Sequence, residues 1–511
     1  RNVLLQTGNV EANYLIPPGS MIIPNLQPEA PLIAAILEFD ADIKESVLVE
    51  ERLRNLKDGS SIMYDTTAFN LTMMYGLEAV TVPSNLEVGL KEWSPQNISI
   101  KTNPEAIIWA VDGVDDNSVA FAARLMEKGV EVRIIDKEAL LSKQSLSRGS
   151  IAVLAMDNPE YEDLSETVNS IATDLDISVL SIESGFGAEE LPDWGGRHFR
   201  LLERPQIAIL SQSGFSSYDV GVSWWSLDHH LGIRHSQIDA SLVNYADLRR
   251  YNTIILPSGY RDMGEYEKKV LSDWMEQGGT LIAHAASSSA LASEQGIGSV
   301  KLLQNTFEES EKYNISLQRE LSALYEELDI ESVNSNKVDL DTAYPWEQSE
   351  GKYPPSQLEY RDNWQSIFMP SGAFVSGRTD QEHWLTFGTN STLPLLYRSY
   401  PVLMSDDSSE APIRVGVFSD SAKANTYSTI NWSDIPPGKE LNVRMSGLLW
   451  PEAAQRIANS AYLTRDRIGK GQLILFSGEP NFRGATLGTN RVWLNAVVYG
   501  AGLGTEPRIN P

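Results

Sequence analysis

A short turn in the middle of the chain carries residue types that could do chemistry. His284, Ala285 and Ser287 directly follow residues 280–283, an apolar run typical of a buried strand. A serine at such a turn can attack a carbonyl group when a base removes its proton and backbone N–H groups stabilise the oxyanion. The Gly-x-Ser-x-Gly pattern of serine hydrolases is absent from the sequence. We interpret the turn as a degenerate, non-catalytic elbow, with a serine hydrolase as the alternative.

Three closely spaced histidines are a second candidate, because imidazole nitrogens bind zinc. These are His229, His230 and His235, and their spacing matches no known zinc pattern. His229 and His230 also stand at the predicted end of a helix before Gly232, where the helix dipole favours histidine. We therefore expect a structural role for them.

An acidic loop with Asp112, Asp115 and Asp116 follows a predicted strand, and its carboxylates could bind calcium. Their spacing does not match an EF-hand loop. Acidic residues also cap helices, where they accept hydrogen bonds from free N–H groups. We expect no metal site in the chain, and these aspartates are weak candidates for one.

Aromatic side chains gather in a stretch rich in proline and tyrosine, which cannot form a regular helix or central strand. Trp346, Tyr353 and Trp364 are candidates there for a surface that binds a peptide or glycan. The tryptophans at 224–225 have helical spacing and are expected in the core. Residues 211–217 lack the glycines and lysine of a phosphate-binding loop, so we interpret them as an ordinary connection.

Composition excludes several classes of function. The 511 residues include 41 Lys and Arg against 69 Asp and Glu, a net charge of -28 that repels nucleic acid phosphates. No apolar run is long enough to span a bilayer, so we expect no transmembrane segment. Because the chain has no cysteine, disulfides, thiol catalysis and cysteine-ligated zinc are excluded.

Strand and helix patterns alternate along the chain and predict an α/β protein of two to four domains. The first strands are expected at residues 106–111, 130–135, 151–154 and 177–180. Helical stretches at 118–128 and 164–175 separate them. Strands joined by single helices indicate a parallel sheet built from right-handed crossovers.

A second α/β unit begins at Pro205. Its strands are expected at residues 206–210, 253–257, 280–283 and 471–476, an order that suits a flavodoxin-like doubly wound domain. We therefore divide the chain into an N-terminal segment at 1–103, a parallel α/β domain at 104–204, and a doubly wound domain at 205–511 with a large insertion at about 294–410.

A series of sequence blocks resembles one protein family in order and spacing. Among them are YDTTAFNL at 64–71, GLLWPE at 447–452 and IGKGQLILF at 468–476. The others are 74–77, 148–151, 182–186, 205–210, 224–228, 278–283, 480–484, 488–491 and 494–496. Together they resemble the region after the catalytic domain in large bacterial zinc carboxypeptidases of the carboxypeptidase A type. That region ends in a class I glutamine amidotransferase-like domain, in which a turn like the one at 284–287 presents a nucleophilic cysteine.

The resemblance implies zinc chemistry that this chain itself does not support. Such peptidases bind zinc through a His-x-x-Glu pair and a distant His. None of the six histidines here has Glu three positions later, so no catalytic residue is carried over. We expect no cofactor in this chain and zinc in a peptidase domain or chain upstream of Arg1.

The expected function is therefore that of a non-catalytic accessory and assembly region, with residues 1–103 packed on the peptidase or on a sheet. The resemblance also implies a secreted, periplasmic or cell-surface bacterial protein, and we expect it to form homo-oligomers. A structural module that binds extracellular peptide or glycan through the aromatic insertion is the alternative.

Overall fold

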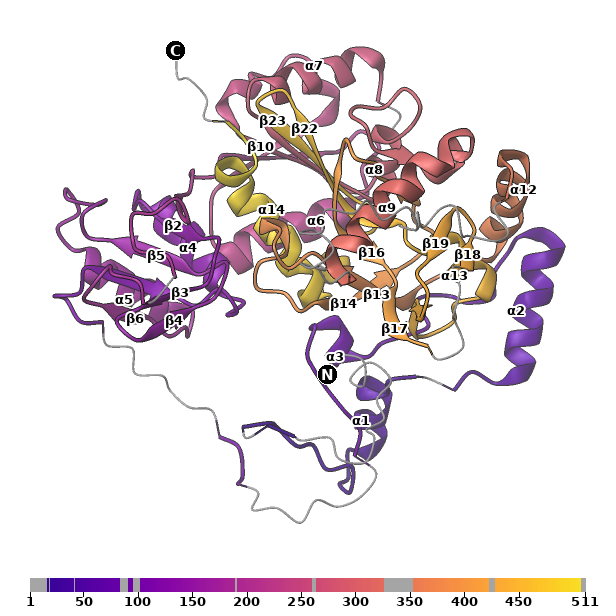
Figure 1. The fold of residues 1–511 in the computed structure, drawn as a ribbon, viewed down its shortest axis with the longest axis horizontal. Helices are drawn as coiled ribbons and strands as arrows, with labels where there is room; N and C mark the ends of the chain where they lie inside the picture. The colour runs from indigo at the N-terminus through magenta and orange to yellow at the C-terminus, as the bar shows by residue number, and fades with distance from the viewer. Residues whose placement is uncertain are drawn as a thin grey trace, which may run out of the picture.

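The computed structural model describes residues 16–17, 19–40, 42–82, 91–94, 102–188, 191–259, 263–325, 353–421 and 428–506. They form a mixed α/β protein with several β-sheets (Figure 1), which confirms the predicted α/β class. No helix within these residues combines the length and the apolar character needed to cross a membrane.

The first α/β unit, at the left of Figure 1, contains a five-stranded sheet in the order β6-β1-β5-β2-β7. Trp109 and Val153 point to the core beneath its two helices. Ile108 and Leu154 face the other side, toward the β3–β4 hairpin. The elements are β1 (Ile108–Val111), α4 (Ser118–Glu127), β2 (Arg133–Ile135), β3 (Ala139–Leu141), β4 (Gln144–Leu146), β5 (Ile151–Leu154), α5 (Leu164–Asp174), β6 (Leu180–Ile182) and β7 (Phe199–Leu201).

Every strand pairing in this sheet is antiparallel, so the prediction of a parallel sheet at 104–204 is wrong. The helix α4 does connect two strands that run in the same direction, because β1 and β2 are both antiparallel to β5. However, β5 lies between them, as in a split β-α-β unit. The sequence pattern reveals the crossover but not which strand fills the gap.

The second unit is built on a larger sheet, in which five strands run parallel in the order β9-β8-β10-β11-β23. Successive residues of β8 alternate between its two faces, with Ile209 on the side of α14 and Leu210 on the side of α7. Because helices cover both faces, these strands are apolar throughout. The elements are β8 (Ile207–Ser211), α6 (Ser217–Trp225), β9 (His235–Asp239), β10 (Thr253–Leu256), α7 (Glu265–Glu276), β11 (Thr280–His284), α8 (Ala285–Leu291), β23 (Gly471–Phe476) and α14 (Leu487–Leu503).

The same sheet continues past β23 through antiparallel strands, in the order β22, β16, β13 and β14. Part of the region interpreted as an insertion at 294–410 therefore extends the main sheet. Its elements are β12 (Lys301–Leu302), α9 (Ser310–Tyr325), α12 (Pro355–Gln365), β13 (Ala373–Thr379), β14 (Thr392–Tyr397), β15 (Leu403–Met404) and the start of β16 (Glu410–Val415). After it come β17 (Val417–Asp420), β18 (Ser428–Ile430), β19 (Ser433–Ile435), β20 (Lys439–Asn442), β21 (Arg444–Ser446), α13 (Pro451–Ile457) and β22 (Ala461–Ile468).

The N-terminal segment contributes α1 (Ala30–Leu37), α2 (Glu45–Asp58) and α3 (Leu71–Met74). Helix α3 docks on the second unit through the buried Met73 and Met74. Helix α1 buries none of its residues. Helix α2 lies at the right edge of Figure 1, beside α12 and α13. Helix α3 is thus one of the anchors of the segment on the second unit.

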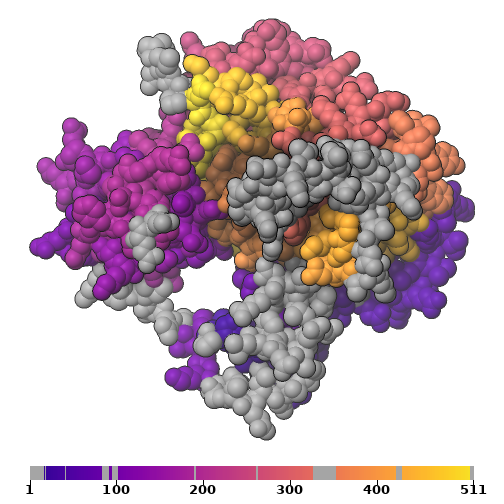
Figure 2. Space-filling model, viewed as in Figure 1, coloured from indigo at the N-terminus to yellow at the C-terminus, as the bar shows by residue number. Residues whose placement is uncertain are grey.

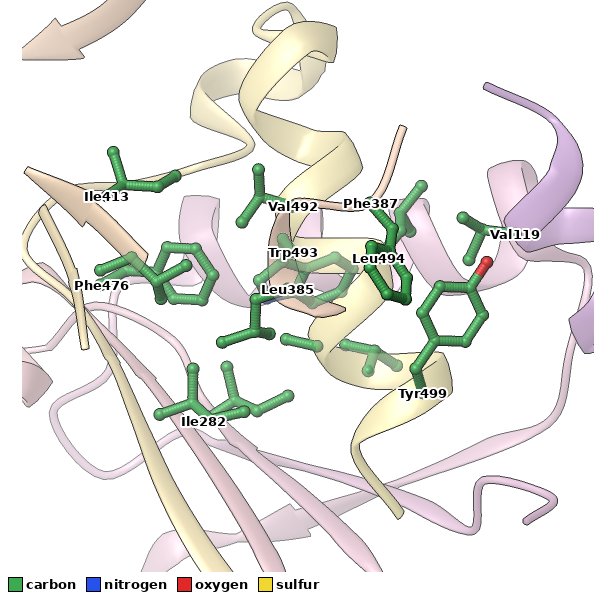
Figure 3. Close-up of a cluster of buried hydrophobic side chains, with 14 of the residues drawn as sticks. Val119, Ile282, Leu385, Phe387, Ile413, Phe476, Val492, Trp493, Leu494 and Tyr499 are labelled. Atoms are coloured by element: carbon green, nitrogen blue, oxygen red, sulfur yellow. The ribbon is translucent and has the colours of Figure 1, made fainter. Parts of the chain in front are cut away.

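Helix α14 connects the two units from within. Of its 17 residues, 14 are buried. Trp493 packs in one cluster with Ile282 and Phe476 of the main sheet, and Tyr499 lies beside Val119 of α4 (Figure 3). Both units therefore pack against the same helix, α14.

A buried guanidinium group on α14 fixes this arrangement. Arg491 is 3% exposed, and its Nη1 donates to the carbonyl oxygen of Asp115 at 2.7 Å. Its Nη2 donates to the carbonyl oxygen of Gly113 at 2.8 Å and to Ser118 Oγ at 3.1 Å. Its Nε donates to Asn495 Oδ1 at 3.1 Å. The charge is thus satisfied by the loop before α4, in the first unit.

Arg491→Met should lower the free energy of unfolding by about 3 kcal/mol, because it leaves the loop carbonyls buried without donors. Arg491→Lys should recover less than half of that loss, since an ammonium group lacks the planar fork that reaches several acceptors. Denaturant unfolding followed by circular dichroism measures both values. The exposed Arg467, changed to Met as a control, should alter stability by no more than about 0.5 kcal/mol. An equally small effect of Arg491→Met would contradict the structural role that we assign to the Arg491 guanidinium.

Candidate functional site

The turn at His284 has the backbone of a nucleophile elbow but no nucleophile. Strand β11 ends at His284, and helix α8 begins at the next residue. That residue, Ala285, has φ 44°, in the left-handed region that costs an L-residue energy. The strained position carries a methyl group, which cannot attack a substrate.

The side chains around Ala285 do not form a catalytic pair. His284 is 1% exposed and packs edge-on against the rings of Phe476 and Trp493, at 5.7 and 6.0 Å. Burial lowers its pKa to about 3, so its ring is neutral. The Ser287 hydroxyl donates to the carbonyl oxygen of Pro257 at 2.6 Å, so its proton is already committed. These contacts favour the degenerate elbow over a serine hydrolase.

A second group of titratable side chains lies at the carboxyl end of the parallel strands. Asp219 stands in the first turn of α6, after β8, and Glu479 stands in the loop after β23. Both are half-buried. In α/β proteins this edge of the sheet is where ligands bind.

Burial disturbs the ionisation of both carboxyl groups. Burial raises the pKa of Glu479 to about 7, and the charge of Asp219 adds to the effect. Arg398, Tyr400 and Arg483 oppose it. Burial likewise raises the pKa of Asp219, against the opposing effects of its N-cap serine and Arg398. Paired carboxyl groups with raised pKa values are a feature of functional sites.

The basic and phenolic groups at this edge of the sheet differ in the ion pairs and hydrogen bonds that they form. Arg483 forms a two-pronged ion pair with Asp65 of the N-terminal segment, at 2.8 and 3.1 Å. Arg398 donates to the carbonyl oxygen of Ser371 at 3.1 Å, yet forms no ion pair within the described residues. Tyr400 is 9% exposed, and its hydroxyl has no hydrogen-bond partner of normal geometry in the described part of the chain. We define the carboxyl-edge cluster as Asp219, Arg398, Tyr400 and Glu479.

Sequence reasoning did not find the carboxyl-edge cluster. Its members come from three separate segments, and a lone Glu after a strand has no motif. A signal did exist in the loop at 211–217, which we interpret as an ordinary connection. Its residues Gln212, Ser213 and Gly214 all have positive φ, and such strain often marks functional loops.

The acidic loop before α4 serves a structural purpose. The side chains of Asp112 and Asp115 each accept a hydrogen bond from the backbone N–H group two residues further on. Asp116 lies 3.7 Å from Arg491. The loop carbonyls that could face a calcium ion instead bind the Arg491 guanidinium. Among the described residues, no three His, Asp or Glu side chains are grouped so that they could hold a metal ion.

The histidine cluster packs around one tryptophan. His229 and His230 lie in a π-helical turn (Ser226–Leu231), and their ring centres are 4.9 and 4.5 Å from that of Trp225. Burial lowers the pKa of His230, and the neighbouring His229 adds to this. The turn ends at Gly232, as the sequence predicts. These contacts favour the structural role.

The structure describes two of the three aromatic candidates. Trp346 lies outside the described residues. Tyr353 stands two residues before the start of α12, and Trp364 stands in its last turn. Tyr353 is half-buried beneath Arg361, whose guanidinium carbon is 4.3 Å from the ring centre. Trp364 is exposed, with its ring edge-on to Phe368.

Two cavities lie elsewhere on the surface. One of about 280 Å³ is lined by α3 and the loop before β14, including Met73 and Asn390. The other, of about 1050 Å³, opens at the amino end of β8 and β9 and includes Arg204, Arg234 and Arg250. Glu127 pairs with the first two of these arginines. Neither cavity is lined by the elbow or the carboxyl-edge cluster.

Comparison with known proteins yields weak structural likenesses. No family model and no curated protein matches the chain. A ThuA-like protein from Bacteroides uniformis is 13% identical, with 60% of this chain and 95% of that chain covered and a TM-score of 0.28. A β-galactosidase from Bacillus circulans sp. alkalophilus is 12% identical, with 72% and 38% covered and a TM-score of 0.29. An exo-β-1,4-mannosidase from an Opitutaceae bacterium is 10% identical, with 58% and 36% covered and a TM-score of 0.27. These scores are too low to support a shared function.

Ala285→Gly should leave the protein as stable or raise its free energy of unfolding by up to about 1 kcal/mol, because glycine relieves the left-handed strain. The matched variant Ala286→Gly, inside α8, should instead lower it by about 1 kcal/mol. Urea unfolding of the two variants measures the difference. Equal losses in both would show that Ala285 is not strained.

Glu479→Gln should change how stability depends on pH. In the wild type, Glu479 is neutral in both the folded and the unfolded chain below a pH of about 4.5. As pH rises from about 4.5 through about 7, the carboxyl group ionises first in the unfolded chain, so the folded state loses stability. The variant lacks this loss, so its unfolding free energy relative to wild type should rise by about 1–3 kcal/mol between pH 4.5 and 8. Urea unfolding at several pH values tests this. A difference that stays constant over this range would contradict the raised pKa.

Proposed function

We propose that this chain is a non-catalytic accessory and assembly region of a secreted, zinc carboxypeptidase-like bacterial protein. The order of its sequence blocks supports the family, and the alanine at the elbow supports the absence of glutaminase chemistry. The parallel strand order β9-β8-β10-β11-β23 supports a flavodoxin-like, class I glutamine amidotransferase-like second unit, since it repeats the order 2-1-3-4-5.

The observation that carries the assembly role is the orientation of helix α2, which faces its polar side inward. Glu51 and Asn55 are buried, and Asn55 Nδ2 donates to Glu51 Oε1 at 3.1 Å. Glu51 Oε2 accepts from the N–H group of Ile62 at 2.7 Å. Arg52 fixes the helix to the second unit through its ion pair with Glu452 and its position over the Phe368 ring, 4.2 Å away.

The opposite face of α2 is apolar and points to solvent. Val49, Leu53 and Leu56 follow each other at spacings of four and three residues, so they form one stripe. A helix at the surface of a soluble monomer normally shows the reverse pattern. Contiguous apolar surface of this kind marks an interaction site. Figure 2 shows indigo N-terminal residues at the right edge of the molecule.

Helix α1 supports the same interpretation. Its sequence APLIAAIL has no charged residue, and none of its side chains is buried. The partner that we propose is the peptidase domain or chain expected upstream of Arg1. Self-association into a homo-oligomer through the same stripe is the other outcome that such a surface permits.

A binding module for peptide or glycan remains the second candidate function. Tyr360, Trp364 and Ile367 are exposed along α12 and the turn after it, at spacings of four and three residues. This second stripe offers aromatic rings for stacking.

Leu53→Glu should disrupt the native assembly without unfolding the chain, because Leu53 is 61% exposed and a charge there costs little in the isolated protein. Native mass spectrometry of the assembly, purified from its source with and without the substitution, checks this. Leu324→Glu, at a leucine with 59% exposure on α9, is the matched control.

An unchanged assembly for Leu53→Glu would contradict the proposed function. Dissociation of a dimer of this chain, with no peptidase present, would replace it with self-association. Loss of peptide or glycan binding in Trp364→Ala, with the assembly intact, would favour the second candidate.

A further inference from the structure

Three arginines stand at the amino edge of the main sheet. Arg204 and Arg250 each come three residues before a strand, β8 and β10, and Arg234 directly precedes β9. These strands are neighbours in the order β9-β8-β10 and run parallel, about 4.8 Å apart. Because parallel strands begin at the same edge of a sheet, the topology brings the three arginines together. All three line one cavity of about 1050 Å³.

Positive charge is in excess at this cavity, although the chain as a whole has a net charge of -28. Glu127, at the end of α4, pairs with Arg204 at 3.2 Å and also with Arg234, so one carboxylate faces two guanidinium groups. Arg250 is exposed and forms no ion pair with any residue that the structure describes. Asp228 is the one acidic residue that lines the cavity. Three positive charges therefore meet two negative ones.

Contacts between the two units hold the wall of the cavity in place. The Glu127 side chain is only 19% exposed, whereas those of Arg204 and Arg234 are 44% and 78% exposed. The buried carboxylate thus holds both guanidinium groups at the surface. Beside it, Arg124 Nε of α4 donates to the carbonyl oxygen of Leu231 at 3.0 Å. Ligand sites are frequent at such junctions, and a ligand here meets charges that are already positioned.

Aromatic and apolar side chains accompany the arginines. Trp224 and Tyr251 both line the cavity, together with Ile207 and Ile233. Trp224 is 42% exposed, so the expectation that it lies in the core is wrong. Tryptophan, tyrosine and arginine are the side chains that contribute most to the binding energy of protein partners. The cavity therefore suits a ligand that carries both anionic and apolar groups.

The position of the cavity on the sheet favours carboxylates over phosphate groups. Phosphates in α/β proteins bind at the carboxyl ends of the strands, where helix N-termini offer backbone N–H groups. At this opposite edge helices end instead, α4 at Glu127 and the π-helical turn after α6 at Leu231. Their C-termini carry partial negative charge, which disfavours the dense charge of a phosphate compound. Guanidinium groups alone suffice for carboxylates, which they bind through two parallel hydrogen bonds.

We propose that this basic cleft, defined by Arg204, Trp224, Arg234, Arg250 and Tyr251, binds an acidic peptide segment of a partner protein in an extended conformation. Side chains of an extended peptide alternate between its two sides, so acidic and apolar residues in turn present both kinds of group. The carboxylates pair with the three arginines, and the apolar side chains contact the two rings. The proposal depends neither on the peptidase assignment nor on the apolar stripe of α2.

Isothermal titration calorimetry of the full chain at pH 7 tests the proposal with a capped nine-residue peptide in which Glu alternates with Leu. This peptide should bind saturably. The same peptide with Gln in place of Glu should bind about tenfold more weakly, because it lacks the charged hydrogen bonds to arginine. The version with Ser in place of Leu should bind about threefold more weakly, because it lacks the apolar contacts. Inorganic tripolyphosphate should bind about tenfold more weakly than the Glu-Leu peptide.

Variants place the peptide in the basic cleft. Arg234→Gln and Arg250→Gln should each weaken the Glu-Leu peptide about tenfold, with a folded chain confirmed by circular dichroism. Arg250→Lys should bind more tightly than Arg250→Gln but less tightly than wild type, since lysine keeps the charge without the planar fork. Arg319→Gln is the matched control and should bind as wild type does, because this arginine is 68% exposed on α9 and does not line the cavity.

Several results would overturn the proposal. These are no saturable binding of the Glu-Leu peptide, equal binding of its Gln version, and unchanged binding in both Gln variants of the cleft. Tripolyphosphate that binds as tightly as the peptide would replace the acidic peptide with a general site for polyanions. Each of these results leaves the docking role of α2 untouched, because that role is measured by the association of the native assembly.

Discussion

The buried Arg491 guanidinium is the constraint on which the arrangement of the two units depends. An arginine at this depth must have its donors satisfied, because an uncompensated buried charge costs several kcal/mol. The acceptors come from the carbonyl groups of the loop before α4, and Asn495 on the same helix completes the set. Helix α14 can therefore pack against the main sheet only while the split β-α-β unit is in place beside it (Figure 3).

The position of Arg491 also explains two other features, the acidic loop before α4 and the glycine at position 388. The acidic loop cannot open to a calcium ion, because its carbonyl oxygens already accept from Arg491. Gly388, with φ 76°, must lack a side chain, since a Cβ atom there would lie 2.4 Å from both the Arg491 guanidinium and the Gly113 carbonyl oxygen. The elbow sits on the other side of the same helix, where His284 packs on Trp493 as part of the core.

The sequence predicts the elements of this protein better than their arrangement. Four of the five parallel strands of the main sheet are expected where they occur, because apolar runs with turn residues at their ends have few other structures; the fifth, β9, has a mostly polar sequence and is not predicted. The antiparallel order of the first sheet could not be predicted, since the same alternation of strands and helices suits both a contiguous and a split unit. The elbow lies where the sequence predicts it, but its left-handed alanine is visible only in the backbone.

The parts of the molecule that bear on function depend on three-dimensional context. The significance of Glu479 arises from Asp219 and Tyr400, which lie far away in the sequence. The apolar stripe of α2 has the pattern of any amphipathic helix, and only its packing reveals that the polar side faces inward.

The docking role of the apolar stripe on α2 is the central claim about function. Hydroxyl-radical footprinting of Leu53 and Leu56, in the isolated chain and in the assembly purified from its source, tests that claim most directly. The account predicts labelling in the isolated chain and protection in the assembly; equal labelling in both would contradict it.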